Sequence, residues 1–260
     1  MSNLLSLKNI YKMFNKSTVD ETTLFDDFNL DIQEGDFVSI VGSNGSGKTT
    51  LLNIISGSTP VDGGDVLLRN ENINKMKEYE RARKIARVYQ DPALGTSPNL
   101  TVLENLALAD NKGHFYGLSF ALNKKKKAEY QELLKSLGMG LEEKMNTKVK
   151  KLSGGQRQAL ALLMATLQPV DILLLDEHTA ALDPKTSEEI MKLTNRIIKD
   201  KKITTLMVTH NLRYAVEYGN RILMFNEGKI IIDKSNEEKD KTSVDDLLKT
   251  FNEISIECGN

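Results

Sequence analysis

The consecutive residues Gly42 to Thr49 have the types and spacing of a loop that binds phosphate. They read Gly-Ser-Asn-Gly-Ser-Gly-Lys-Thr and fit the P-loop pattern, in which a glycine and four residues precede glycine-lysine-threonine. Glycines permit backbone angles that turn amide N–H groups toward phosphate oxygens, and Lys48 would place a positive charge on the β and γ phosphates. We therefore expect phosphate to contact Gly42, Ser43, Asn44, Gly45, Ser46, Gly47, Lys48, Thr49 and Thr50.

An acidic pair, Asp176 and Glu177, directly follows the apolar run 172–175. A carboxylate at the C-terminal end of a buried parallel strand lies where an α/β fold presents its ligands. There Asp176 could hold Mg²⁺ together with the Thr49 hydroxyl, and Glu177 could orient or deprotonate an attacking water. A lone acidic strand end is common in α/β proteins, but a pair in the same chain as a P-loop indicates phosphoanhydride hydrolysis.

The segment Leu152-Ser153-Gly154-Gly155-Gln156 predicts a second helix start that could face an anion. Ser153 and Gln156 have the spacing of a capping box, and the glycines between them leave bare amides at the positive end of the helix. One nucleotide does not need two phosphate cradles from a single chain. The economical explanation is a dimer in which this helix faces the nucleotide of the partner copy.

Short apolar runs alternate with helical patterns along the chain, which predicts an α/β core with a mostly parallel sheet. We expect buried strands over residues 37–41, 172–175 and 204–208, and a helix over residues 48–56 that ends at Gly57. Residues 221–225 and 229–232 should form a hairpin. The stretch up to about Ile32 alternates more and predicts an antiparallel β subdomain.

The middle of the chain has a helical pattern instead. Thr101 and Glu104 have capping-box spacing, and a second helix is predicted over residues 123–137, ending at Gly138. We interpret residues 92–150 as a helical subdomain inserted into one nucleotide-binding domain of residues 1–260. Residues 233–260 would be a charged tail with a short helix over 243–251.

Composition excludes several classes of function. The chain has 35 Lys+Arg and 36 Asp+Glu, a net charge of −1, which gives no support to nucleic-acid binding through a basic face. Its one cysteine, Cys258, can form no intramolecular disulfide, as expected in a reducing compartment. The first residues lack a signal-peptide pattern, and no apolar run approaches the ~18 residues of a membrane-spanning helix.

The glycine segment at Ser153 resembles the signature of the ATP-binding-cassette (ABC) ATPases, and the resemblance extends from about residue 5 to residue 232. Gln90, in the segment 88–92, matches the family's glutamine loop. Asp183 matches the loop after the acidic pair, and His210 matches the switch histidine. Phe14 stands where the family places an aromatic ring against adenine, although neighbouring Tyr11 is a rival candidate.

The resemblance implies that two copies sandwich two ATP molecules with Mg²⁺. Each ATP would lie between the P-loop of one copy and the signature residues Ser153, Gly154, Gly155 and Gln156 of the other. Gln90 would touch Mg²⁺ or the attacking water, and His210 would contact the γ-phosphate. Asp183 would couple the two sites. Glu177, His210 and Gln90 would thus be the catalytic residues, and Thr49, Gln90 and Asp176 would hold the metal.

Two departures from the family pattern stand out. His178 follows the acidic pair where the family usually has proline, which is either a tolerated loop substitution or a pH-sensitive position. Residues 158–165 lack the arginines that are common on the helix after the signature, so the contacts of this helix should differ. Neither departure changes the phosphate chemistry.

An ATP-driven dimer closes and opens, and another protein must use that motion. The resemblance implies that this chain is the detached ATPase subunit of a membrane transporter. The expected partners are a second copy, an integral membrane permease docked around residues 91–100, and a solute-binding lipoprotein. The complex would lie at the cytoplasmic face of the plasma membrane, with this chain peripheral. Residues 176–183 and 209–221 resemble bacterial importers with branched-chain-amino-acid-type permeases, which suggests import of a small solute such as an amino acid.

Three alternatives remain open at the level of sequence. The chain could power export of lipoproteins or drugs, or it could be a soluble assembly ATPase without a permease, such as those that scaffold iron–sulfur clusters. The Gln156-Arg157-Gln158 form of the signature favours transport over assembly. A regulatory cassette that binds ATP without hydrolysing it is disfavoured, because Lys48, Asp176, Glu177 and His210 are all in place.

Overall fold

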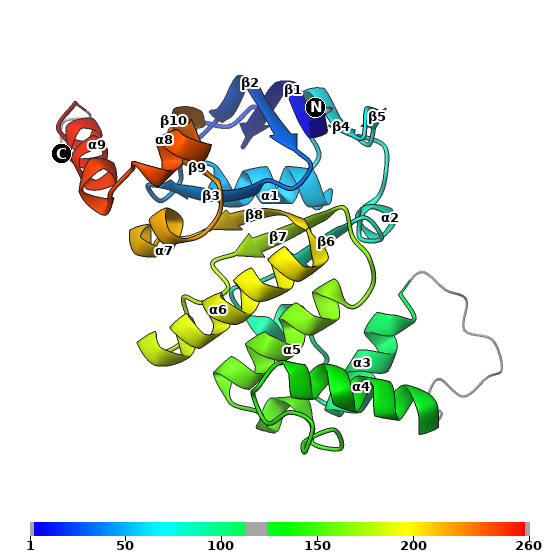
Figure 1. The fold of residues 1–260 in the computed structure, drawn as a ribbon. Helices are drawn as coiled ribbons and strands as arrows, with labels where there is room; N and C mark the ends of the chain where they lie inside the picture. The colour runs from blue at the N-terminus through cyan, green and yellow to red at the C-terminus, as the bar shows by residue number, and fades with distance from the viewer. Residues whose placement is uncertain (1–2, 113–123, 258–260) are drawn as a thin grey trace. The chain divides into compact units, whose positions relative to one another are not determined.

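A computed structural model of the chain describes residues 3–112 and 124–257 (Figure 1). The chain forms two compact units, of which the first contains residues 1–82 and 203–260 and the second contains residues 83–202. Within the described ranges, no helix is both long and apolar enough to cross a bilayer. Cys258 and the first residue of the predicted helix 123–137 lie outside the described residues.

The first unit contains an antiparallel sheet in the order β2-β1-β4-β5. Its strands are β1 (Asn3–Phe14), β2 (Thr22–Gln33), β4 (Gly63–Leu68) and β5 (Glu71–Asn72). Apolar and polar residues alternate along β2, so that Phe28, Leu30 and Ile32 are buried while their neighbours face solvent. The predicted antiparallel subdomain is confirmed, and β4 and β5 extend it beyond residue 32. The short helix α2 (Glu78–Arg81) follows.

The first unit also contains strands of a mixed sheet, which pair in parallel around β3. Strand β3 (Phe37–Gly42) pairs in parallel with β8 (Thr204–Val208) and β9 (Arg221–Asn226), and β10 (Lys229–Ser235) pairs antiparallel with β9. Every residue of β3 is buried, as expected of a strand with parallel neighbours. The predicted strands and hairpin are confirmed, and β10 continues past the predicted end at Ile232.

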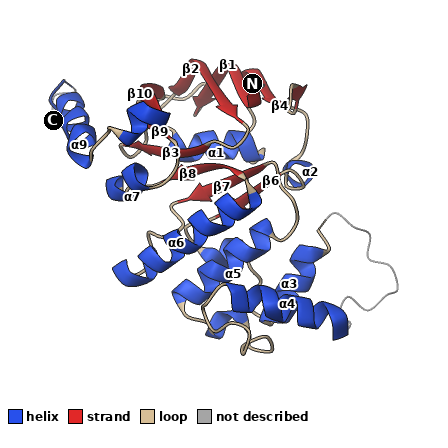
Figure 2. Cartoon of the chain, in the orientation of Figure 1, coloured by secondary structure: helices blue, strands red, loops and turns tan. Residues whose placement is uncertain are grey.

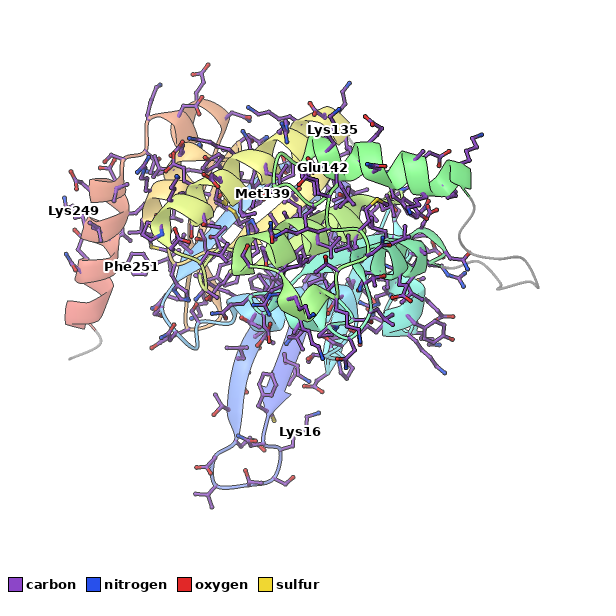
Figure 3. All side chains as sticks on the ribbon, turned by 90° about the horizontal axis from the view of Figure 1, so that it is seen from below. Lys16, Lys135, Met139, Glu142, Lys249 and Phe251 are labelled. Carbon is purple, nitrogen blue, oxygen red and sulfur yellow. The ribbon has the colours of Figure 1, made fainter. Side chains whose placement is uncertain are left out.

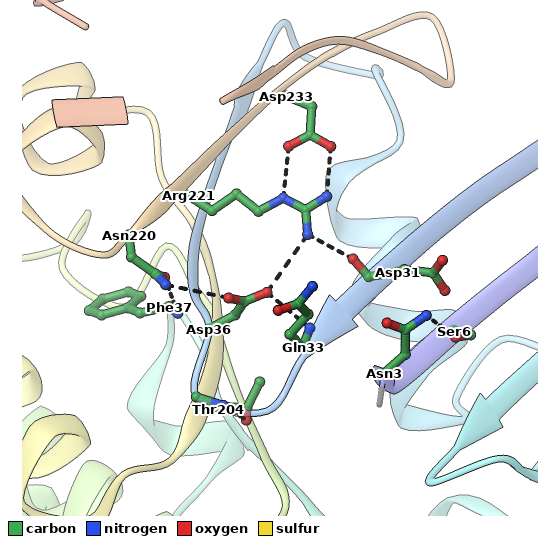
Figure 4. Close-up of polar contacts among 11 residues, drawn as sticks. Asn3, Ser6, Asp31, Gln33, Asp36, Phe37, Thr204, Asn220, Arg221 and Asp233 are labelled. Carbon is green, nitrogen blue, oxygen red and sulfur yellow. Dashed lines mark hydrogen bonds and ion pairs between the residues drawn. The ribbon is translucent and has the colours of Figure 1, made fainter. Parts of the chain in front are cut away.

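Arg221 ties the two sheets of the first unit together (Figure 4). Its guanidinium donates two parallel hydrogen bonds to Asp233, at 2.7 and 2.6 Å, and a third to the carbonyl of Asp31 on β2 at 2.7 Å. The carboxylate of Asp36, just before β3, lies 3.7 Å away. Bidentate arginine–carboxylate pairs fix geometry as well as adding energy. Arg221 therefore fixes the end of β2 against β9 and β10.

Three helices cover the end of the first unit: α7 (Leu212–Glu217), α8 (Asn236–Asp240) and α9 (Val244–Glu257). Leu247 anchors α9, because it is fully buried with Val41, Ala215, Ile222 and Met224. The predicted helix over residues 243–251 exists and is longer than expected. Helix α8 was not predicted, because its sequence, Asn-Glu-Glu-Lys-Asp, has no apolar face.

The second unit combines a pair of strands with helices (Figure 2). Strand β6 (Ile85–Val88) pairs in parallel with β7 (Ile172–Asp176). The elements around them are the 3-10 helix η1 (Pro92–Leu94), α3 (Val102–Asp110), α4 (Lys124–Ser136), η2 (Val149–Lys151), α5 (Gly154–Thr166) and α6 (Pro184–Lys201). The capping box at Thr101 is present. Helix α4 ends at Ser136 and Gly138 follows with a positive φ, which confirms the predicted end of this helix to within one residue. Residues 139–148 form turns and bends rather than a further helix. The subdomain boundaries 92–150 stay a prediction.

Asp110 at the end of α3 connects three segments of the second unit. Its carboxylate accepts hydrogen bonds from Lys126 and Tyr130 of α4, both at 2.7 Å, and from Gln168 after α5, at 2.8 Å. Partial burial opposes its ionisation, but the hydrogen bonds from these three side chains outweigh it and lower the pKa of Asp110. The ionised carboxylate therefore stabilises the packing of α4 on α3.

We predict that Asp110→Asn lowers the free energy of unfolding by about 1 to 3 kcal/mol at pH 7, because charged hydrogen bonds are lost. Since the folded-state pKa of Asp110 lies below the usual pKa of an aspartate, the difference in unfolding free energy should be constant at neutral pH and narrow below about pH 4. Chemical denaturation of the variant and the wild type at several pH values measures this difference. Glu129→Gln is the matched control, because Glu129 contacts the same Lys126 at 3.6 Å but is solvent-exposed. Equal effects from both variants would contradict this role of Asp110.

Candidate nucleotide-binding site

The P-loop joins β3 to α1 (Lys48–Ser56) and folds around its own lysine. Lys48 is buried, and its ammonium donates hydrogen bonds to the carbonyls of Gly42 at 2.9 Å and Ser43 at 2.7 Å. These bonds close the loop into a ring with the positive charge inside. The Lys48 ammonium, which we expect to contact the phosphates, is therefore held at the start of α1.

Two glycines of the loop have conformations and surroundings that a side chain would disturb. A Cβ at Gly42 would lie 2.3 Å from the carbonyl oxygen of Phe225 on β9, and one at Gly47 would lie 3.0 Å from the ring of Phe25 on β2. Gly47 precedes α1 with a φ of 104°, and it provides no side-chain cap for the first amides of the helix. The start of a helix carries a partial positive charge, which suits an anion such as phosphate.

Ser46 adds a further group that fits a phosphate ligand. Its Oγ is buried, and among the described residues none forms a hydrogen bond with it. A buried hydroxyl without a partner is unfavourable, so a bound group that supplies one would be stabilised. The glycine cradle, the enclosed lysine and this hydroxyl together match the chemistry of a nucleotide's phosphates.

His210 stands at the same edge of the sheet as the P-loop. It lies two residues after the end of β8 and is exposed, and β8 is a parallel neighbour of β3. The amide of Thr209 donates to the carbonyl of Ile40 on β3 at 3.1 Å, and Asn211 caps α7. The carboxyl ends of parallel strands form the ligand-binding edge of an α/β sheet. The structure thus brings His210 to the edge from which the P-loop begins.

Phe14 ends β1, and its side chain is 38% exposed. It pairs in register with Thr22 of β2, three residues before Phe25, the residue that lies against Gly47. Tyr11, the rival candidate, is half-buried and pairs with Gly63. Exposure and the connection through β2 therefore favour Phe14 as the ring that could meet a nucleotide base.

In the second unit, the signature segment begins α5 with the predicted capping box. Ser153 Oγ accepts from the amide of Gln156 at 3.2 Å, and the Gln156 side chain accepts from the amide of Ser153 at 3.3 Å. Gln156 also contacts Lys144 at 3.0 Å and the carbonyl of Met139 at 3.1 Å. In this structure Gln156 therefore braces the signature segment against the preceding turns.

The N-terminal ends of α5 and α6 lie side by side. A Cβ at Gly155 would lie 2.4 Å from Cγ2 of Thr186, and one at Gly154 would lie 3.1 Å from Cδ2 of Leu182. Asp183 caps α6 by accepting from the amide of Thr186 at 3.1 Å, and these Thr186 hydrogen bonds lower the pKa of Asp183. Glycine at position 155 thus permits the close approach of the two helix ends.

The acidic pair follows β7, and the structure adds a partner that sequence reasoning missed. Arg87 of β6 forms an ion pair with Asp176 at 2.5 Å. Glu177 has a positive φ of 48°, so the extended conformation of β7 ends at Asp176. An arginine inside a short strand gives no sequence signal of such a pairing, because the partner is 89 residues away.

His178 does not behave as the pH-sensitive position that its sequence context left open. It is 2% exposed, and its Nε2 lies 3.1 Å from Oγ1 of Thr194. Burial lowers the pKa of His178 to about 4, so the imidazole is neutral at pH 7. Thr194 donates its hydroxyl hydrogen to the carbonyl of Ile190, so Nε2 of His178 is the donor of the pair.

Gln90 lies just after β6 and is exposed. The side chain of Gln158 on α5 is buried and donates to the carbonyl of Tyr89 at 3.3 Å. The helix after the signature, which lacks the family's usual arginines, therefore contacts the glutamine loop through an amide. Sequence reasoning noted the departure but did not find this contact.

Residues 25–180 match a family described as ABC transporter. The chain belongs to the ABC transporter family. It is an ATP-binding cassette with ATPase activity.

Relatives of this cassette are similar over nearly their whole length. A protein named tyrosine transport ATP-binding protein, from Clostridioides difficile (strain R20291), is 46% identical over 248 residues, which cover 95% of this chain and 98% of that protein. The phosphonates import ATP-binding protein PhnC of Lactococcus lactis subsp. cremoris (strain SK11) is 31% identical, with 95% and 99% covered. The dimeric post-hydrolysis cassette MJ0796 bound to ADP and Pi has a TM-score of 0.74 and 33% identity, with 89% and 98% covered.

The predicted site residues of the cassette are divided between the two units. The first unit carries Phe14, the P-loop residues 42–50 and His210, and the second carries Gln90, residues 153–156, Asp176, Glu177 and Asp183. The α/β fold with its antiparallel subdomain is confirmed by the solved cassettes. The individual roles of these residues stay predictions.

We predict that Gly155→Ala destabilises the cassette by about 1 to 3 kcal/mol, because the new methyl group would overlap Thr186. Adding Thr186→Ser removes the overlapping Cγ2 and should restore most of the lost stability, measured by chemical denaturation. Gly154→Ala is the matched control in the same helix turn, since its neighbour is the flexible end of Leu182. Failure of Thr186→Ser to rescue the variant would contradict the close packing of the two helix ends.

Proposed function

We propose that two copies of this cassette bind two ATP molecules between them and use their hydrolysis to power a separate membrane permease. The enclosed Lys48 and the start of α1 without a side-chain cap carry the proposal, because together they place a positive charge and the positive end of a helix where phosphates could bind. The glycine-rich start of α5 supports the dimer, since a second cradle in one chain is explained by a nucleotide held by the partner copy. Similarity to a dimeric cassette supports the same arrangement.

Each proposed role follows from the chemistry of its residue. Lys48 and the loop amides would bind the β and γ phosphates, while Ser153, Gly154 and Gly155 of the other copy would face the γ-phosphate. Glu177 would orient or deprotonate the attacking water. His210 would contact the γ-phosphate. Gln90 would touch Mg²⁺ or the attacking water and report to the helical subdomain, and Asp183 would couple the two sites across the dimer. Catalysis of this kind relies on positioning and electrostatics rather than on a covalent intermediate.

The proposed metal is Mg²⁺, which when bound neutralises charge on the β and γ phosphates. Thr49, Gln90 and Asp176 offer a hydroxyl, an amide oxygen and a carboxylate, and these oxygen donors fit its preference. Within residues 3–112 and 124–257, no group of three or more His, Cys, Asp or Glu could hold a metal ion. This fits an ion that takes its remaining ligands from phosphate and water. Arg87 holds one oxygen of Asp176.

The proposed cargo is an amino acid, taken up through a permease and a solute-binding lipoprotein, with this chain at the cytoplasmic face of the plasma membrane. The relative whose name specifies tyrosine transport supports this cargo, because it is 46% identical over 95% of the chain. Other relatives are named for import of xylose/arabinose or phosphonates, which supports import rather than export. Tyrosine is the first cargo to test.

We predict that Lys48→Ala and Glu177→Gln separate binding from hydrolysis. Loss of the lysine should weaken ATP binding about 10- to 100-fold, the equivalent of a charged hydrogen bond. Loss of the glutamate charge should leave binding intact and slow hydrolysis at least about 100-fold. Titration calorimetry and phosphate release measure the two effects, with exposed Lys8→Ala as the control. Normal turnover by Glu177→Gln would refute its assignment as the base.

The transport proposal is tested by uptake of radiolabelled tyrosine in cells that lack the chain. We expect uptake to fall and to be restored by the wild-type chain but not by Glu177→Gln. Purification from gently solubilised membranes should then recover a polytopic permease and a solute-binding lipoprotein. Unchanged uptake would exclude tyrosine as the cargo, and recovery of only soluble partners would favour the assembly ATPase.

A further inference from the structure

A single carboxylate holds the end of β1 on both sides of Phe14. Asp62, which precedes β4, accepts a hydrogen bond from the backbone amide of Met13 at 2.8 Å and another from Lys16 at 2.9 Å. The ammonium of Lys12 lies 3.3 Å from the same carboxylate. Figure 3 places Lys16 on the projecting hairpin of β1 and β2. Residues before and after Phe14 are thus tied to one side chain.

Lys12 extends this arrangement to the ring itself. Its ammonium lies 5.2 Å from the centroid of the Phe14 ring and also donates to the carbonyl of Pro60 at 2.9 Å. Lys12 is 7% exposed, whereas Phe14 is 38% exposed. The cation therefore occupies the protein side of the ring, and the remaining surface of Phe14 is left to solvent.

The Phe14 ring is connected to the P-loop through β2. Phe14 pairs with Thr22, and three residues further along the same strand Phe25 lies 3.0 Å from a Cβ built at Gly47. The backbone of Leu24 also closely approaches Gly228, whose amide donates to the carbonyl of Ser46 at 3.1 Å. At about 3.3 Å per strand residue, Phe14 stands roughly 10 Å along β2 from this contact.

We propose that Asp62 is a positioning residue for the nucleotide base, because it holds Phe14 where the ring can stack on the adenine of an ATP bound at the P-loop. This inference rests on the proposed function. Asp62 touches neither base nor phosphate in this account and acts through Phe14. It would raise affinity by reducing the freedom that the ring loses when the base binds.

Asp62 keeps its negative charge, so its contacts with Lys12, Met13 and Lys16 persist. Partial desolvation opposes its ionisation, but hydrogen bonds from Lys16, the Met13 amide and Lys12 outweigh it and lower the pKa of Asp62 to about 2. The carboxylate is therefore ionised at every pH at which the protein would work. Asp62→Asn would remove the negative charge and replace one acceptor oxygen by an amide donor, which would face the ammonium of Lys16 or that of Lys12, so these contacts would weaken.

The test compares ATP with inorganic triphosphate, which has phosphates but no base. Equilibrium binding would be measured for the wild type, Asp62→Asn, Phe14→Ala and the double variant. We expect each single variant to weaken ATP binding about five- to tenfold, within the range of base–aromatic stacking, and to leave triphosphate binding unchanged. The double variant should bind ATP no more weakly than Phe14→Ala.

Asp65→Asn is the matched control, because Asp65 lies three residues further along, at β4, and its carboxylate accepts from Asn72 instead. It should change neither affinity. Equal loss of ATP and triphosphate binding in Asp62→Asn would show a general structural role and overturn the proposal. So would unchanged ATP binding, or losses that multiply in the double variant. Failure of the wild type to bind either ligand would instead refute the proposed function.

Discussion

The enclosure of the Lys48 ammonium by the carbonyls of Gly42 and Ser43 is the interaction on which the rest of this site depends. A buried cation is tolerated only when hydrogen bonds replace its lost water, and here the loop's own backbone supplies them. That geometry requires glycine at position 42, where a side chain would collide with the backbone of β9. The sheet must therefore place β9 beside β3 before the loop can close.

The other predicted site residues lie at the ends of strands and the starts of helices. In the first unit, His210 follows β8 beside the P-loop strand, and Phe14 is linked to the loop through β2. In the second unit, the starts of α5 and α6 lie against each other, with a glycine where they touch. Both arrangements present backbone amides or exposed side chains rather than buried catalytic clusters. In the proposed mechanism, the groups at these strand ends and helix starts would act by being positioned around ATP.

Local patterns predicted much of the fold because they depend on neighbouring residues. The bounds of α1 and β8 match the expectation, since a glycine ends the helix and an apolar run of β-branched and aliphatic residues marks the strand. The capping boxes at Thr101 and Ser153 were found for the same reason. Helix α8 was not predicted because it is entirely polar, whereas the end of α4 was predicted because Gly138 follows it with a positive φ.

The contacts that sequence reasoning missed join residues far apart in the chain. Asp62 meets Met13 across 49 positions, Gln158 meets Tyr89 across 69, and Arg87 meets Asp176 across 89. No spacing rule links such pairs, because the fold alone brings them together. The motif residues themselves were found, since the types and spacing of a phosphate-binding loop follow from its chemistry.

Sedimentation velocity of the Glu177→Gln chain, with and without ATP, tests the central claim most directly. We expect a monomer that becomes a dimer when ATP is added and not when ADP is added, because the γ-phosphate would join the P-loop of one copy to the Ser153 segment of the other. Adding Lys48→Ala should abolish the shift. A chain that binds ATP tightly and remains monomeric at every concentration would contradict the shared nucleotide.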